Sequence, residues 1–130
     1  MRLDLRCDGV KNIAQLSGGR VRTHDLTTPL KPCVPFDLAM SLEVAEHIPK
    51  QYEATYLDNL QCSCRRFLIL SWASPGQFGS GHVNNLNSAD VRSKMKYRGF
   101  EFRNNDTQFL RNKSSLLWFR RNLIVFERHI

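Results

Sequence analysis

The chain has 130 residues, enough for one domain of ordinary size and too few for two. Hydrophobic residues make up 42% and charged residues 24%, which is typical of a folded globular domain rather than a disordered one. No apolar run approaches the roughly 20 residues of a membrane span, and Met1–Arg6 alternates charge with Leu, unlike a signal peptide. We therefore expect a single cytoplasmic domain over residues 1–130, with no membrane partner.

The net charge of +7 is unevenly distributed along the chain. Residues 1–65 contain eight Lys/Arg and eight Asp/Glu, whereas residues 66–130 contain eleven Lys/Arg and four Asp/Glu. A one-sided basic surface is typical of proteins that bind an anionic partner, nucleic acid included. A solvated basic face that maintains solubility explains the same charge equally well.

The four cysteines are Cys7, Cys33, Cys62 and Cys64. None of them forms a C-x-x-C pair, and the single residue between Cys62 and Cys64 is too short a spacing for a usual zinc knuckle. Nothing marks the chain as secreted. We therefore expect four free thiols in a reducing compartment.

Short apolar segments alternate with helical stretches along the chain, which predicts an α/β domain. The expected strands are Leu3–Cys7, Arg20–His24, Phe36–Leu42, Phe67–Trp72, Phe100–Arg103 and Asn122–Arg128. The third and fourth are apolar enough to be buried in a sheet covered on both faces. The last two are separated by a helix, which suggests a final antiparallel pair.

Three helices are expected between these strands. The first follows Pro49 and ends near Arg65, with Tyr56, Leu57, Leu60 and Cys64 on one face. The second spans Ala89 to Arg98, capped by Ser88 and ended by Gly99. The third begins near Asp106. The segment Ala73–Asn87, rich in Gly, Asn and Ser, is a candidate functional loop because it is too long for an idle connection.

The densest group of polar side chains follows the strand Phe36–Leu42, where Glu43, Glu46 and His47 lie within five residues. In open α/β sheets, ligands bind beyond the carboxyl ends of the strands. Two carboxylates and an imidazole can bind a hard divalent cation or perform acid–base chemistry. The alternative is that Glu46 and His47 only satisfy the first turn of the next helix.

The segment Phe36–Pro49 closely resembles the fourth-strand motif of class I S-adenosylmethionine-dependent methyltransferases. In that motif an Asp opens the strand and an E-V-x-E-H-I/V-P run follows it. Asp8-Gly9 resembles the end of the family's second strand, and His24-Asp25-Leu26 the end of its third. Phe67–Trp72 resembles the fifth strand and Gly99-Phe100 the glycine before the sixth, so the resemblance extends from about residue 5 to residue 128.

This resemblance implies a partial Rossmann-like methyltransferase sheet with flanking helices and an antiparallel last strand. It implies S-adenosylmethionine as cofactor and an unidentified methyl acceptor, with Glu46 and His47 as the catalytic residues. Cofactor-binding residues would be Asp8 and Gly9 near the ribose, Asp25 and Leu26 near the adenine, and Ser41. Some family members bind a divalent metal through an E-x-x-E-H run and a later His, which here implies Glu43, Glu46, His47 and His82.

The chain departs from the family at the glycine-rich loop after the first strand, because no such loop precedes Asp8. One interpretation takes Leu3–Gly9 as that loop, but Arg6 and Asp8 would then occupy glycine positions. The other, which we prefer, is that the first strand is missing. The neighbouring strands then close up, or the chain is an N-terminally truncated methyltransferase-like domain.

Three functional hypotheses follow from these features. The first is a methyltransferase. The second is an inactive truncated methyltransferase-like chain or partner-binding module. The third is a basic nucleic-acid-binding domain. A basic rim for an anionic substrate is expected from Arg92, Lys94, Lys96, Arg98, Arg120 and Arg121. For Trp72 we expect core packing rather than a place in a binding pocket, and for Trp118 and Phe119 a place in the core of the final helix and strand.

Overall fold

The computed structural model describes residues 3–4 and 15–129. Asp8, Gly9, Cys7 and most of the expected first strand lie outside the described residues. Its elements, in chain order, are β1 (Leu3–Asp4), β2 (Arg22–Thr23), β3 (Phe36–Ser41), the 3₁₀ turns η1 (Ala45–His47) and η2 (Lys50–Tyr52), α2 (Glu53–Ser63), β4 (Cys64–Ser71), α3 (Ser88–Tyr97), β5 (Phe100–Phe102), α4 (Asn104–Lys113), α5 (Leu117–Asn122) and β6 (Leu123–Arg128). No helix within the described part of the chain has the length and apolar character needed to cross a bilayer.

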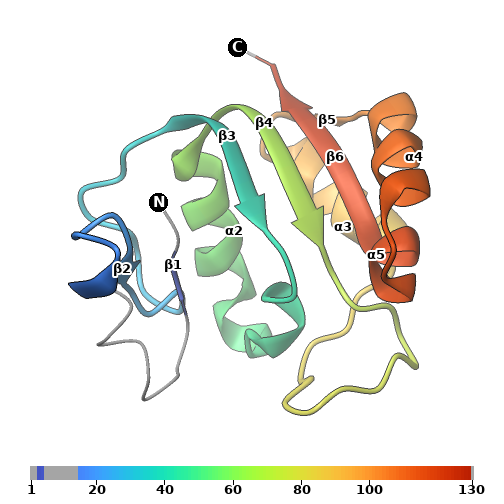
Figure 1. Cartoon of the computed structure of the whole chain (residues 1–130), viewed down its shortest axis with the longest axis horizontal. Coiled ribbons are helices and arrows are strands. Elements are labelled where there is room, and N and C mark those ends of the chain that lie inside the picture. The colour runs from blue at the N-terminus through green and yellow to red at the C-terminus, as the bar shows by residue number, and fades with distance from the viewer. Residues whose placement is uncertain (1–2, 5–14, 130) are drawn as a thin grey trace.

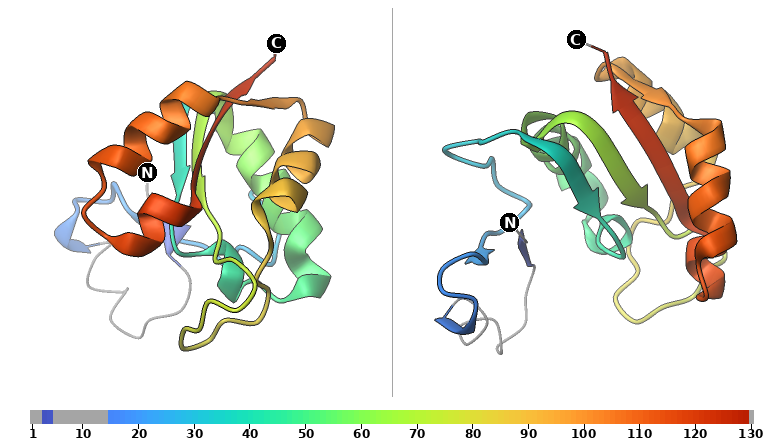
Figure 2. Two further views of the ribbon diagram at one scale, coloured as in Figure 1. Left: turned by 90° about the vertical axis from the view of Figure 1, so that its right-hand side faces the viewer. Right: turned by 45° about the horizontal axis from the view of Figure 1, so that its top comes forward.

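The main sheet has four strands in the order β3-β4-β6-β5 (Figure 1). Strands β3 and β4 are parallel, with Ser41 opposite Leu70, and β6 is antiparallel to both β4 and β5. The expected α/β fold with an antiparallel last strand is therefore confirmed. A separate parallel pair, β1 and β2, lies apart from the main sheet, beyond its β3 side (Figure 2).

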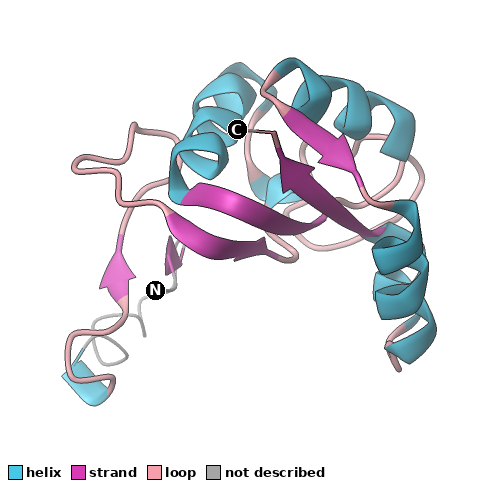
Figure 3. Cartoon of the chain, turned by 90° about the horizontal axis from the view of Figure 1, so that it is seen from above, coloured by secondary structure: helices cyan, strands magenta, loops and turns pink. Residues whose placement is uncertain are grey.

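Helices α2 and α3 cover one face of the sheet, and α4 and α5 lie at the β6 end on the other side (Figure 3). The core forms between α2, α3 and alternate residues of β4 and β6, because side chains of a strand point to opposite faces in turn. Its members include Tyr56, Leu57, Leu60, Cys64, Leu68, Leu70, Val91, Met95, Ile124 and Phe126, all 9% exposed or less. Tyr56, Leu57 and Leu60 thus confirm the apolar face predicted for the first helix, whereas Cys64, predicted on the same face, is the first residue of β4 because the helix ends at Ser63.

Strand β3 is not the buried strand that its sequence suggests. Its alternate residues Phe36, Leu38 and Met40 are 40%, 50% and 58% exposed. No strand among residues 3–4 and 15–129 pairs with the free edge of β3, and no described helix covers the face that carries these three side chains. The apolar run Phe36–Leu42 therefore predicts a strand correctly, but the strand is less buried than the run suggests.

Two helix starts differ from expectation by one or two residues. The N-cap of α3 is Asn87, whose side chain accepts a hydrogen bond from the Asp90 amide at 2.9 Å, and Ser88 is the first helical residue. Helix α4 begins at Asn104 rather than at Asp106, and the Asp106 carboxylate pairs with Arg103 at 3.1 Å instead. Gly99 ends α3 as expected, in the left-handed region at φ 83°.

The prediction of four free thiols is wrong. Cys33 and Cys62 form a disulfide that joins the loop before β3 to the end of α2, and Cys64 is a buried free thiol. Asn59 reinforces the same junction, because its side chain accepts from the Leu30 amide and donates to the Leu26 and Thr28 carbonyls. The spacing of the cysteines in sequence carries no trace of this pairing, since a tertiary contact brings them together.

Candidate functional site

The carboxyl ends of β3 and β4 meet at one edge of the sheet, because the two strands are parallel. The chain leaves β3 after Ser41 into η1 and leaves β4 after Ser71 into the loop 73–87. Ser71 also pairs with Leu123 at the start of β6, so α5 ends at the same edge. The polar residues of both loops are therefore neighbours, as the sequence predicts.

Glu46 lies in η1 with its side chain fully buried, and neither carboxylate oxygen has a hydrogen-bond partner among residues 3–4 and 15–129. Burial raises the pKa of Glu46 above its ordinary value of 4.5, because a charged carboxylate loses its hydration. The charge of Glu43 adds to this rise in the pKa of Glu46, and His47 and His82 counteract it. Burial of an ionised carboxylate without a partner costs free energy, and binding a proton or a cation would relieve that cost.

His47 and His82 are both oriented by backbone carbonyl oxygens. The Nδ1 of His47 donates to the Gly81 carbonyl at 2.9 Å, and the Nδ1 of His82 donates to the Gln77 carbonyl at 3.1 Å. A carbonyl can only accept, so each Nδ1 carries the hydrogen and each Nε2 keeps its lone pair when the ring is neutral. The two rings meet edge to face, with centroids 5.1 Å apart.

Two glycines allow the loop 73–87 to approach these rings. A Cβ on Gly79 would lie within 2.7 Å of three His82 ring atoms, and Gly81 adopts φ 76° with its Cβ position 3.2 Å from His47 Nδ1. The amides of Val83 and Asn84 both donate to the Glu46 carbonyl, at 2.9 and 3.0 Å. The loop is thus built against η1, and the glycines are required by contact as well as by turn geometry.

Among the described residues, Glu46, His47 and His82 form a group whose potential ligand atoms all lie within 4.8 Å of one another. Glu43, the fourth residue of the predicted metal set, is not in this group. Its amide donates to Ser71 Oγ at 2.8 Å, and the Ser71 hydroxyl donates back to Glu43 Oε1 at 3.2 Å. Glu43 has φ 55°, a left-handed conformation that is uncommon for a residue with a side chain.

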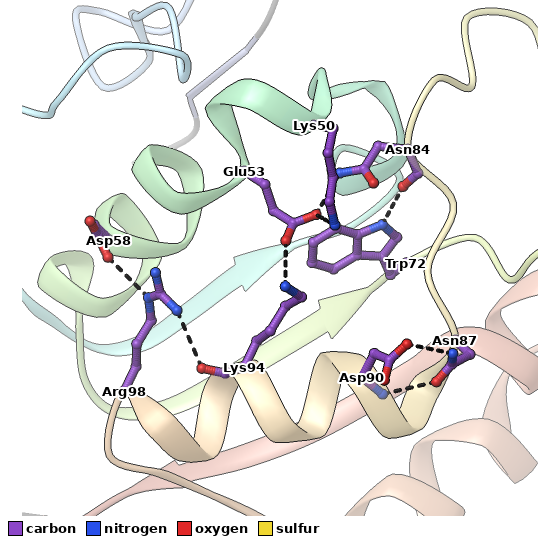
Figure 4. A network of polar contacts seen from close by, with 9 residues as sticks. All are labelled: Lys50, Glu53, Asp58, Trp72, Asn84, Asn87, Asp90, Lys94 and Arg98. Atoms are coloured by element: carbon purple, nitrogen blue, oxygen red, sulfur yellow. Dashed lines mark hydrogen bonds and ion pairs between the residues drawn. The ribbon is translucent and has the colours of Figure 1, made fainter.

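A second buried carboxylate, Glu53, binds the loop 73–87 through Asn84 (Figure 4). It accepts hydrogen bonds from Lys94 at 2.8 Å, Asn84 at 2.8 Å and Lys50 at 3.0 Å. Burial tends to raise the pKa of Glu53, but the bonds from Lys94, Asn84 and Lys50 outweigh it and lower the pKa. The Asn84 carbonyl in turn accepts from Trp72 Nε1 at 2.7 Å, which ties the loop to the end of β4.

The described members of the predicted cofactor set lie apart from this cluster in the hydrogen-bond network. Asp25 is exposed, and its Oδ1 accepts from the amide and hydroxyl of Thr27. Leu26 is 6% exposed and belongs to the core. Ser41 is buried and shares a 2.7 Å hydrogen bond with Tyr56, whose pKa burial raises.

The aromatic predictions have mixed outcomes. Trp72 is 2% exposed and packs edge to face on Tyr56, which confirms its place in the core. Trp118 is 42% exposed, so its predicted core position is wrong, and Phe78 at the loop tip is 98% exposed.

Sequence reasoning missed the residues that support the site rather than those at its centre. These are Ser71, Glu53 and Asn84, together with Asn122, which clamps the loop to α5. The Asn122 side chain donates to Gln77 Oε1 at 2.6 Å and accepts from Ser74 Oγ at 3.0 Å. No local sequence signal marks them, because each acts on a residue at least 28 positions away.

No protein-family model matches the sequence, and no curated protein matches it. Solved structures with similar folds include a magnesium protoporphyrin IX methyltransferase from Synechocystis PCC 6803 with bound S-adenosylhomocysteine, 19% identical with a TM-score of 0.60 over 92% of this chain. A 1,6-didemethyltoxoflavin-N1-methyltransferase from Burkholderia thailandensis is 18% identical, with a TM-score of 0.65 over 98% of this chain. A pericyclic reaction enzyme is 13% identical, with a TM-score of 0.61 over 98%.

This chain spans 57% and 60% of the two methyltransferases and 35% of the pericyclic enzyme. The likeness thus covers nearly all of this chain and about half of each methyltransferase. At these identities it concerns the arrangement of strands and helices, not the residues of a site. The chain has the class I methyltransferase fold.

Proposed function

We propose that this protein binds S-adenosylmethionine and transfers its methyl group to an acceptor that binds beside Glu46, His47 and His82. The observation that carries the proposal is the sheet order β3-β4-β6-β5 with β6 antiparallel. Methyltransferases with bound S-adenosylhomocysteine are among the structures of similar fold, at TM-scores of 0.60 and 0.65. The polar cluster at the carboxyl edge of β3 and β4 supports the acceptor side.

Asp8, Gly9, Asp25, Leu26 and Ser41 remain the proposed cofactor-binding residues. Asp25 fits this role best of those described, because its exposed carboxylate is an acceptor suited to hydroxyl or amino groups. Leu26 belongs to the hydrophobic core, and Ser41 is the last residue of β3. Asp8 and Gly9 lie outside the described residues.

The cofactor supplies an electrophilic methyl group on a positively charged sulfur. This chain's residues orient the acceptor in line with that methyl and take the proton that the acceptor loses. His47 and His82 suit proton acceptance, since their Nδ1–H groups are fixed and their Nε2 lone pairs remain available. Glu46 lies within reach of both rings.

Glu46, His47 and His82 also fit a divalent cation. The set offers one carboxylate and two imidazoles, and no other described residue forms a hydrogen bond with the Glu46 carboxylate. Backbone carbonyls fix both histidines, which is the usual support of histidine ligands. A cation there would lower the pKa of a bound hydroxyl. Glu43 enters the set only if its bond with Ser71 is released.

Calorimetric titration of the chain with S-adenosylhomocysteine tests the cofactor part of the proposal. Saturable binding is expected, accompanied by a rise in the melting temperature that grows with ligand concentration. Adenosine and homocysteine, added separately, are the matched controls. No binding at millimolar S-adenosylhomocysteine would overturn the proposal and favour a partner-binding module without catalysis.

Conversion of radiolabelled S-adenosylmethionine to S-adenosylhomocysteine separates methyl transfer from mere cofactor binding. This assay is needed because a pericyclic reaction enzyme has a similar fold, so the fold alone does not establish methyl transfer. A candidate acceptor should be methylated by the wild type and not by Glu46→Ala or His47→Ala, which should retain cofactor affinity. Saturable cofactor binding without turnover on any acceptor class would contradict methyl transfer.

Titration with Mn²⁺ and Zn²⁺ alone tests the metal part independently of activity. Glu46→Gln and His82→Ala should each weaken binding at least about tenfold, because each removes a ligand. His24→Ala is the matched control, since its ring forms hydrogen bonds with Thr28 and with no other residue that the structure describes. Equal metal affinity in the wild type and His82→Ala would exclude this site.

A further inference from the structure

A small cavity of about 210 Å³ lies between α4 and α5, outside the cluster just described. It is lined by Gln108, Arg111 and Asn112 of α4 and by Arg120 of α5. The lining thus combines two guanidinium groups with two carboxamides and includes no carboxylate. Its volume is below the roughly 300–1,000 Å³ of pockets that hold drug-sized ligands, so it suits a single small group.

Both guanidinium groups are held in place by backbone oxygens. Arg111 Nε donates to the Leu123 carbonyl at 2.8 Å, and Arg120 Nε donates to the Ser114 carbonyl at 2.6 Å. These bonds use one N–H of each fork and leave the Nη groups as further donors. A guanidinium fixed in this way loses little freedom when it binds a ligand.

The positive charge around the cavity is not compensated. Within the described residues, neither Arg111 nor Arg120 forms an ion pair with a carboxylate. Asp106, the acidic residue of α4, is paired with Arg103. Arg111 is half-buried, and burial lowers its pKa, so its charge is partly desolvated without an anion beside it.

The cavity lies near the edge of the sheet that carries Glu46, His47 and His82. Arg111 bonds to Leu123, which pairs with Ser71 at the end of β4. Asn122, two residues after Arg120, clamps Gln77 and Ser74 of the loop that contains His82. A group bound between α4 and α5 is therefore connected to the loop through α5.

We propose that this cavity is a binding site for a phosphate group, with Arg111 and Arg120 as the charged donors and Gln108 and Asn112 as neutral ones. Guanidinium forks match the spacing of phosphate oxygens and form strong charge-assisted hydrogen bonds with them. Four donor side chains suit a tetrahedral anion with three or four oxygens better than a carboxylate with two. The site does not depend on methyl transfer.

Calorimetric titration with inorganic pyrophosphate at low ionic strength tests the proposal. We expect saturable binding that Arg120→Gln and Arg111→Gln each weaken about tenfold or more, because each removes a charge-assisted contact. Arg121→Gln is the matched control: it removes the same charge from the next position of α5, which does not line the cavity. That variant should remain within about twofold of the wild type.

Equal losses in Arg120→Gln and Arg121→Gln would overturn the site, because they would indicate diffuse attraction to a basic surface. The absence of saturable binding to the wild type would overturn it as well. Arg111→Lys, checked by an unfolding curve, serves as a second variant in case Arg111→Gln fails to fold. It should also lose affinity for pyrophosphate, because an ammonium lacks the paired donors of a guanidinium.

The source of the phosphate is distinguished by a short single-stranded RNA. If the RNA competes with pyrophosphate, and its affinity falls steeply with salt and with Arg120→Gln, the phosphate belongs to a nucleic-acid backbone. If pyrophosphate binds and the RNA does not compete, the phosphate belongs to a small molecule. RNA binding that is indifferent to Arg120→Gln while displacing pyrophosphate would contradict the site.

Discussion

Glu46 and Glu53 are two buried carboxylates seven positions apart, and the fold treats them in opposite ways. Glu53 has three hydrogen-bonding partners, and its pKa is lowered. Glu46 is buried more completely, its two carboxylate oxygens have no hydrogen-bond partner in the described part of the chain, and its pKa is raised. The difference separates a carboxylate that stabilises the fold from one that is available for chemistry.

The two residues also act on the same loop. Glu53 binds the side chain of Asn84, and the Glu46 carbonyl accepts the amides of Val83 and Asn84. The side chain of Glu46 takes no part in that support. The two residues therefore differ in the hydrogen bonds of their side chains. Substituting each side chain should have different effects on the free energy of unfolding.

The largest effect is expected from Glu53→Gln, which removes the charge that Lys94, Lys50 and Asn84 share. We expect a loss of about 2–3 kcal/mol in the free energy of unfolding at neutral pH, less than for a fully buried pair because both lysines are partly exposed. Urea unfolding measures it.

The loss in Glu53→Gln should depend on pH. A lowered pKa means that the ionised form stabilises the fold above the ordinary value of 4.5, and that this stabilisation disappears as the pH falls through the folded-state pKa. The stability curves of the wild type and the variant should therefore converge in acid. Parallel curves would show that Glu53 acts by packing alone.

A smaller effect is expected from Asn84→Ala, which removes one of the three bonds to Glu53. The loss should be about 1–2 kcal/mol, because a buried hydrogen bond to a charged group disappears while the two lysines remain. Hydrogen exchange should reveal faster opening of residues 81–85 in this variant. Asn85→Ala, which removes side-chain bonds to the Ser74 and Gln77 carbonyls but none to Glu53, is the matched control.

The smallest effect on stability is expected from Glu46→Gln, within about 1 kcal/mol, because no hydrogen bond is lost. Its sign should change with pH. A raised pKa means that the wild type is favoured below the ordinary value of 4.5 and loses stability as the pH rises through the folded-state pKa. As the pH rises through this range, Glu46→Gln should become more stable relative to the wild type. A decrease in its relative stability would contradict a buried Glu46 carboxyl without partners.

A substantial part of the fold was predictable from the sequence. The apolar segments Phe36–Leu42 and Phe67–Trp72 correspond to β3 and β4, and the helix after Pro49 packs through the predicted face. These features depend on local periodicity. The degree to which β3 is buried was not predictable, because its apolar residues are the same whether or not another element packs on them.

The candidate site was predicted in part. Glu46, His47 and His82 come together as expected, since parallel strands bring their following loops to one edge. Glu43 was predicted as their companion but is bonded to Ser71 and has left-handed backbone geometry. The direction of a side chain after a strand depends on that geometry, which the residue type does not reveal.

The sequence by itself determined the order of the main-sheet strands and of α2, α3 and α4, the polar residues after β3 and the glycine-rich loop that approaches them. The tertiary structure alone decided that Cys33 and Cys62 are paired, that Glu53 is satisfied and that Glu46 is not. The physical reason is that periodicity and turn chemistry act over a few residues. The partners of a cysteine or a buried carboxylate come from distant parts of the chain, which only the fold brings together.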